Sequence, residues 1–149
     1  MGFNRKSTAE QVTEGLDLTG KTIVITGVNS GLGLESMRVL CLRGAHVIGL
    51  ARTLEKARQA CDSVAGKTTP LACELSELAS VKAAGESIRT MAMPIDVLIT
   101  NAGIMAPNQQ VSVAIPCCFR VRCLQNLRNC EETEAQMHYC KVLIAWFLK

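Results

Sequence analysis

Short apolar runs alternate with stretches of helical periodicity between residues 20 and 103. Residues 22–26 are a β-branched run, which is typical of a strand buried on both faces of a sheet. The same pattern predicts three further strands, the second of them weaker: residues 46–50, 69–73 and 95–100. Apolar residues at helical spacing predict helices between these strands, over residues 34–43, 54–64 and 76–91.

Repeated strand–helix units with connections this short predict an α/β fold. Such units give a parallel sheet with right-handed crossovers and helices on both faces, the doubly wound, Rossmann-like architecture. The expected strand order is 3-2-1-4. The pattern stops at four strands, so we expect an incomplete version of this fold in which the outer edge of the fourth strand is bare.

A lead-in segment precedes the first strand. Ser7 and Glu10 have the spacing of a capping box, in which a hydroxyl caps a helix start and a carboxylate reaches back. They predict a short helix that ends near Gly15. The chain therefore divides into three segments: the lead-in at 1–19, a half-domain at 20–107 and a tail at 108–149.

Composition excludes several classes of protein. A chain of 149 residues with 48% hydrophobic and 19% charged residues is typical of one globular domain, not of disorder. The net charge of +3 is scattered without a basic run, which argues against nucleic acid or a membrane surface as partners. No apolar run approaches the roughly 18 residues of a membrane span, and no secretory signal is evident. We therefore expect a cytoplasmic protein with reduced cysteines.

A glycine-rich segment, residues 26–33, directly follows the first strand and opens the first long helix. Glycines let the backbone turn sharply and approach a pyrophosphate without a Cβ in the way. The following helix then points its free N–H groups at the phosphate oxygens, and Ser30 can add a hydroxyl donor. An ordinary tight turn is the alternative, but the position between strand and helix favours a dinucleotide site.

The spacing of this segment resembles the Thr-Gly-x-x-x-Gly-Leu-Gly motif of the short-chain dehydrogenase/reductase family. Asn101-Ala102-Gly103 follow the fourth strand, where that family has Asn-Ala-Gly. The resemblance covers about residues 15–107 and is strongest to the retinol dehydrogenase and WW-domain oxidoreductase branch. It implies hydride transfer between a nicotinamide cofactor and an alcohol or carbonyl. It also implies these cofactor-binding residues: Gly27, Asn29, Ser30, Gly31, Leu32, Gly33, Arg52, Glu74, Leu75, Asn101, Ala102 and Gly103.

The end of the second strand favours NADP(H) over NAD(H). Ala51 stands where the NAD-specific members of the family have an aspartate, and Arg52 comes next. A guanidinium there suits a 2′-phosphate through charge-assisted contacts, although an ordinary surface cation is the alternative. Glu74 and Leu75 match the Asp-Leu or Asp-Val that lies against the adenine in the family, with Glu for Asp as a departure.

The resemblance does not supply a catalytic site. The family mechanism needs a serine and a Tyr-x-x-x-Lys pair, in which the tyrosine exchanges a proton with substrate. Tyr139 is the only tyrosine, and Lys141 lies two residues later, on another face of a helix. We therefore predict no catalytic residue. Three functions stay open. The first is an oxidoreductase whose full gene product is longer than this sequence. The others are a non-catalytic NADP(H)-binding or subunit-docking module that can oligomerise, and an unstable fragment.

The tail departs from the family pattern where the composition also changes, near Pro107. One hypothesis is a shifted reading frame or a misjoined exon with early termination. The other is a genuine divergent tail, in which residues 131–149 form a helix that covers the bare sheet edge or docks on a partner. Five of the eight cysteines lie here without a Cys-x-x-Cys pair, so we expect free thiols and no metal: Cys117, Cys118, Cys123, Cys130 and Cys140.

Overall fold

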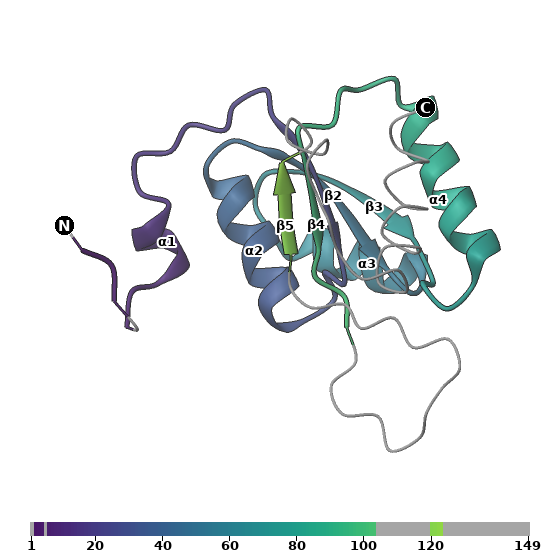
Figure 1. Cartoon of the computed structure of the whole chain (residues 1–149), viewed down its shortest axis with the longest axis horizontal. Helices are drawn as coiled ribbons and strands as arrows, with labels where there is room; N and C mark the ends of the chain where they lie inside the picture. Colours follow the sequence, from purple (N-terminus) through teal and green to yellow (C-terminus); the bar gives the residue numbers. More distant parts are fainter. Residues whose placement is uncertain (1, 5, 104–119, 124–149) are drawn as a thin grey trace, which may run out of the picture.

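A five-stranded sheet with helices on both faces forms the body of the protein (Figure 1). The computed structural model describes residues 2–4, 6–103 and 120–123. The strands are β1 (Thr22–Thr26), β2 (His46–Ala51), β3 (Lys67–Ala72), β4 (Val97–Thr100) and β5 (Arg120–Cys123). The helices are α1 (Ala9–Val12), α2 (Gly31–Leu42), α3 (Leu54–Asp62) and α4 (Leu78–Thr90).

The strand order is β3-β2-β1-β4-β5, and the first four strands are parallel. This confirms the predicted order 3-2-1-4 and the doubly wound architecture. All five residues of β1 are buried because β2 and β4 flank the strand and helices cover both of its faces. The β-branched run at residues 22–26 suits this central position, since such side chains pack well on a pleated surface.

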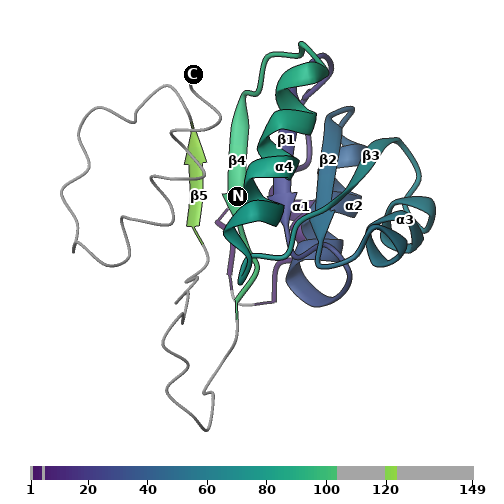
Figure 2. The ribbon, with the colours of Figure 1, turned by 90° about the vertical axis from the view of Figure 1, so that its right-hand side faces the viewer.

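Alternate residues of the strands build two separate cores, one on each face of the sheet (Figure 2). Ile25 and Val47 pack with Met37 of α2 and Cys61 of α3. On the opposite face, the central strands pack against Val81, Ala84 and Ile88 of α4. The two cores hold the sheet rigidly between helices, so the segments that leave its carboxyl edge start from fixed positions.

The outer edge of β4 is not bare. β5 pairs with β4 in antiparallel register, from Val97↔Cys123 to Thr100↔Arg120. The prediction of an unpaired fourth strand is therefore wrong, because four residues of the tail complete its hydrogen bonding. Most of the tail lies outside the described residues. The structure therefore tests neither the possible helix at 131–149 nor the reading-frame hypothesis, and of the five tail cysteines it describes only Cys123.

The helix starts differ slightly from the sequence prediction. Thr8, not Ser7, caps α1: its Oγ1 accepts from Gln11 N at 3.2 Å, and Thr8 N donates to Gln11 Oε1 at 2.9 Å. The capping box is thus one residue later than expected, with Gln11 in place of Glu10. Helix α4 begins at Leu78, two residues after the predicted start at 76, and the Ser76 hydroxyl donates to Glu74 Oε1 at 2.9 Å.

His46 is buried at the first position of β2, between β1 and β3. Its side chain is 8% exposed, and Nε2 lies 2.8 Å from Thr69 Oγ1. The reason is that β3 begins at Lys67, two residues earlier than predicted, so that both neighbouring strands extend alongside His46. Within the described residues, Nδ1 is buried without a hydrogen-bond partner. Burial, followed by the charge of Lys67, lowers the pKa of His46.

Stability should therefore decrease on acidification below the ordinary histidine pKa of about 6.5. The unfolded chain binds a proton there, whereas the folded state resists protonation of His46, so acid favours unfolding. The contribution is fully present above that pKa and is lost as the pH falls below it. Urea unfolding should show a larger decrease in the free energy of unfolding between about pH 7.5 and pH 5.5 for the parent protein than for His46→Gln. Equal losses in the two proteins would contradict this account of His46.

Candidate cofactor site

The carboxyl ends of β1, β2, β3 and β4 lie at one edge of the sheet, because these four strands are parallel. The chain continues from β1 toward β2 on one side, whereas β4 lies on the other side of β1. This reversal is the topological switch point at which open α/β sheets bind ligands. All twelve predicted cofactor-binding residues belong to segments that leave this edge: residues 27–33, 52, 74–75 and 101–103.

The loop between β1 and α2 is held against the sheet by its backbone. Gly27 N and Val28 N both donate to Leu50 O, at 2.7 and 3.2 Å, and Val28 is fully buried in the core. Gly27 and Gly31 have φ values of +74° and +61°, which glycine adopts without a Cβ penalty. Of the three residues between them, Val28 is buried, whereas Asn29 and Ser30 are exposed.

Helix α2 starts with features that suit an anion. Its N-cap, Ser30, makes no side-chain capping bond, and the first turn contains no acidic residue. Asn29 Nδ2 donates to Ser30 Oγ at 3.4 Å, so both polar side chains stand together at the helix start. The N–H groups of the first turn have no partner within a helix, and the helix dipole favours negative charge there. Leu32 leaves an apolar side chain 70% exposed in the same turn.

Two glycines allow the loop to lie close to the end of β4. A Cβ on Gly33 would collide with Gly27 O and Asn101 Nδ2. A Cβ on Gly27 would lie 2.9 Å from Ala102 Cα, closer than real Cβ contacts. The glycine spacing therefore reflects close packing of three backbone segments.

Thr26 and Asn101 form a clamp between β1 and β4. Thr26 Oγ1 accepts hydrogen bonds from Asn101 N and Ala102 N, both at 3.1 Å. Asn101 Nδ2 donates to Thr26 O at 3.1 Å and to Gly27 O at 3.2 Å. We name these four bonds the Thr26–Asn101 clamp. It fixes the glycine loop to the Asn-Ala-Gly segment across 75 residues of sequence.

Thr26 was not among the predicted site residues. Its hydroxyl is buried and faces the neighbouring strand, so the clamp depends on β1 and β4 being adjacent. The local signal was present, because a threonine closes the strand immediately before the first glycine. Its partner became evident only from the register of β1 against β4 in the structure.

Arg52 and Glu74 leave neighbouring strands. Arg52 is exposed, whereas Ala51 before it is buried, so the arginine is the first residue of that segment able to reach a ligand. Glu74 Oε1 accepts from Ser76 N at 3.1 Å and from Ser76 Oγ. These bonds, the backbone one first, lower the pKa of Glu74, and the charge of Arg52 contributes further. Leu75 packs against the core on the α4 face and is partly buried.

The remaining predicted residues occupy the β4 side of the site. Asn101 and Ala102, which take part in the clamp, are half-buried, and Gly103 is exposed.

Over the part of the chain that the structure describes, no helix is both long and apolar enough to cross a membrane.

The sequence matches the family described as short chain dehydrogenase over residues 21–116, more than half of the chain. This segment includes the glycine loop, the Thr26–Asn101 clamp and all four parallel strands. The chain therefore belongs to the short-chain dehydrogenase family, as the two motifs indicated.

Particular relatives and structures agree with this. The chain is 38% identical over 109 residues to the short-chain dehydrogenase TIC 32 B, chloroplastic, of Brassica napus, covering 70% of this chain and 34% of that protein. It is 34% identical over 107 residues to the WW domain-containing oxidoreductase of Gallus gallus, covering 68% and 26%. A solved structure of a putative uncharacterized protein from Mycobacterium Paratuberculosis is 39% identical, with a TM-score of 0.56, covering 62% of this chain and 33% of that chain. The chain thus spans about a third or less of the length of its relatives.

Proposed function

We propose that residues 20–103 are the NADP(H)-binding half of a short-chain dehydrogenase/reductase. The observation that carries this proposal is the Thr26–Asn101 clamp, which holds the glycine loop against the end of β4. The clamp keeps a backbone-lined surface at the topological switch point, next to the start of α2. A dinucleotide fits such a surface because its pyrophosphate needs N–H donors and close backbone approach.

Each proposed binding residue has a role that its position supports. The loop from Gly27 to Gly33 and the first turn of α2 would hold the pyrophosphate, with Asn29 and Ser30 as polar neighbours. Glu74 and Leu75 would lie on the adenine side, and Asn101 to Gly103 would lie on the nicotinamide side. A Cβ at Gly27 or Gly33 would meet the protein's own atoms and displace the loop, so glycine at both positions supports the loop geometry that this proposal needs.

The choice of NADP(H) over NAD(H) depends on Arg52. Its exposure at the end of β2, beside a buried alanine and not an aspartate, favours a ligand with a 2′-phosphate. Similar solved structures contain either cofactor. A metagenomic short-chain oxidoreductase, 28% identical, is a complex with NADP, and a putative D-mannonate oxidoreductase, 26% identical, has bound NAD.

Substitution of Arg52 tests this choice. Arg52→Asp should weaken NADPH binding by about tenfold to a hundredfold, because it removes a charge-assisted contact and adds a like charge. NADH, which lacks the 2′-phosphate, should bind as well as before or better. Titration calorimetry with both cofactors measures this. As a control, Arg58→Asp makes the same charge change on an exposed residue of α3 and should affect neither cofactor. Equal weakening of NADPH and NADH by Arg52→Asp would exclude the 2′-phosphate assignment.

The activity of the whole protein is proposed from the family: hydride transfer between NADP(H) and an alcohol or carbonyl. No Tyr-x-x-x-Lys sequence occurs in the 149 residues, so we propose that the chain as given binds cofactor without turnover. Reading the transcript past Pro107 in all three frames tests the truncation hypothesis. A Tyr-x-x-x-Lys segment in another frame would support it, whereas its absence from every frame would favour a non-catalytic binding or docking module.

The cellular location stays a prediction. Two relatives from Brassica napus are named as chloroplastic, so fractionation of cells that express the full gene product is the appropriate measurement.

A further inference from the structure

The lead-in helix α1 lies against the outer side of α2, away from the two cores (Figure 1). None of its residues is buried. Its apolar side chain, Val12, is 45% exposed, and Leu16 just beyond it is 53% exposed. Apolar burial therefore contributes little to its position. A helix of four residues is also too short to persist without outside contacts.

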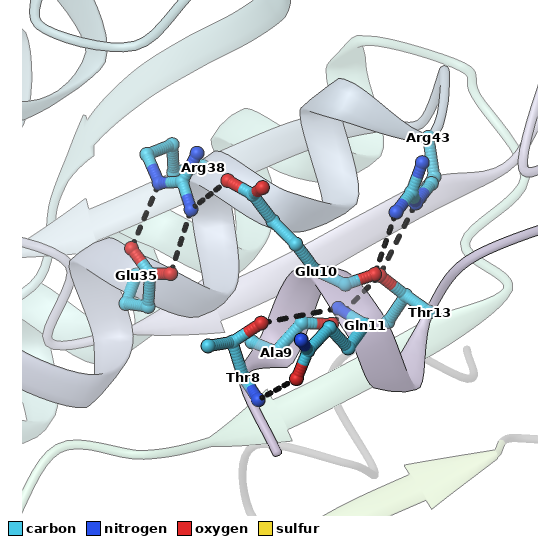
Figure 3. Close-up of polar contacts among 8 residues, drawn as sticks. All are labelled: Thr8, Ala9, Glu10, Gln11, Thr13, Glu35, Arg38 and Arg43. Atoms are coloured by element: carbon cyan, nitrogen blue, oxygen red, sulfur yellow. Dashed lines mark hydrogen bonds and ion pairs between the residues drawn. The ribbon is translucent and has the colours of Figure 1, made fainter. Parts of the chain in front are cut away.

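Arg38 of α2 and Arg43, the C-cap residue of the same helix, hold α1 in place (Figure 3). Arg38 Nη2 lies 2.6 Å from Glu10 Oε1, and the same guanidinium forms a two-bond pair with Glu35 at 2.8 Å. Arg43 Nη2 donates to the backbone oxygen of Glu10 at 2.7 Å, and Arg43 Nε donates to Thr13 Oγ1 at 3.2 Å. The contacts that hold α1 are thus ionic or polar.

The chain becomes firmly attached only after this helix. Leu18 packs against the core, and its N–H donates to Arg43 O at 2.8 Å. Between the helix and this anchor lies Gly15, with φ of +80° and no heavy atom within 4 Å of the place of a Cβ. Glycine at such an open position allows a change of backbone direction without strain.

We propose that the α2 face formed by Arg38 and Arg43 is a charge-dependent docking surface, and that residues 8–13 are its occupant, a strap that opens at Gly15 while the sheet stays folded. Glu10 supplies the complementary charge, with its carboxylate on one arginine and its carbonyl on the other. Exposed ion pairs are individually weak and are screened by salt, so the strap should exchange between docked and open states. In the open state Arg43 loses its bonds to Glu10 O and Thr13 Oγ1, and Arg38 keeps only its pair with Glu35.

Hydrogen exchange of the full 149-residue chain, followed by mass spectrometry, tests the strap. In low salt, the amides of residues 11–13 should be protected by the helix that docking maintains. At about 1 M NaCl, where the screening length is about 3 Å, their exchange should be roughly fivefold faster. Peptides from β1 and α4 should exchange equally in both conditions. The variant Glu10→Gln should show the fast exchange in low salt already.

Glu14→Gln is the matched control. It removes a carboxylate from the same segment, and among the described residues Glu14 has no ion pair, so this variant should behave as the parent. Salt-independent exchange of the strap, or a Glu10→Gln variant identical to the parent, would overturn the proposal. Faster exchange in every segment would show global unfolding instead of a separate opening. Protection that rises with protein concentration would assign the surface to the lead-in helix of a second copy.

Discussion

Replacing Gly33 with alanine should reduce NADPH affinity by about a hundredfold and lower the free energy of unfolding by about 1–3 kcal/mol. A Cβ at this position would collide with a backbone oxygen of the loop and with the amide of Asn101. Neither atom is the end of a flexible chain, because the carbonyl belongs to Gly27 and the amide is held by two hydrogen bonds. The loop must therefore shift, and the phosphate-binding backbone shifts with it.

The control for Gly33 is Gly20→Ala. Gly20 has φ of +77°, but nothing lies within 4 Å of the place of its Cβ. Alanine there should cost about 1 kcal/mol of stability from its left-handed backbone and should leave NADPH affinity unchanged. Chemical unfolding and calorimetric titration of both variants separate the two effects. If Gly33→Ala binds NADPH as tightly as Gly20→Ala does, the glycine loop is not the pyrophosphate site.

Replacing Thr26 with valine should lower the free energy of unfolding by about 1–3 kcal/mol and weaken NADPH binding by about tenfold. Valine keeps the shape of the buried side chain but removes the oxygen that accepts from Asn101 N and Ala102 N. Asn101 N keeps a second acceptor in Ile99 O, so Ala102 N is the donor that loses its partner and carries the cost of desolvation. The end of β4 would then be held to the loop only by the side chain of Asn101.

Thr26→Ser is the matched variant, because it keeps the hydroxyl and loses only a methyl group. It should retain most of the affinity, at a stability cost of about 1 kcal/mol. Urea unfolding and NADPH titration of the two variants give the comparison. A Thr26→Ser variant that binds as poorly as Thr26→Val would show that the hydroxyl is not what positions the loop.

The local parts of the fold were predictable from the sequence. The β-branched run at 22–26 and the glycines after it depend on neighbouring residues alone. Strand β1 forms where the pattern placed it, and α2 begins at Gly31, three residues before the predicted start. The family motifs placed Asn101 at the end of the fourth strand, where the structure also has it. The strand order followed from the handedness and shortness of the connections.

The missed features depend on contacts between distant segments. The clamp at Thr26 exists because β1 and β4 are adjacent. β5 pairs with β4 over four residues that carry no strong strand pattern of their own. His46 is buried because β3 begins at Lys67 and runs alongside it. In each case the decisive partner lies more than 20 residues away, where hydrophobic periodicity gives no information.

The measurement that tests the cofactor site most directly is a nuclear magnetic resonance titration of the ¹⁵N-labelled chain with NADPH, read amide by amide. The account predicts that the largest shifts fall on residues 27–33, 52, 74–75 and 101–103, the segments that leave the carboxyl edge of the sheet. Amides at the amino edge, such as those of Lys21 and His46, should be unaffected. A saturating titration with no shifts in the glycine loop, or with shifts gathered elsewhere, would contradict the proposed cofactor site.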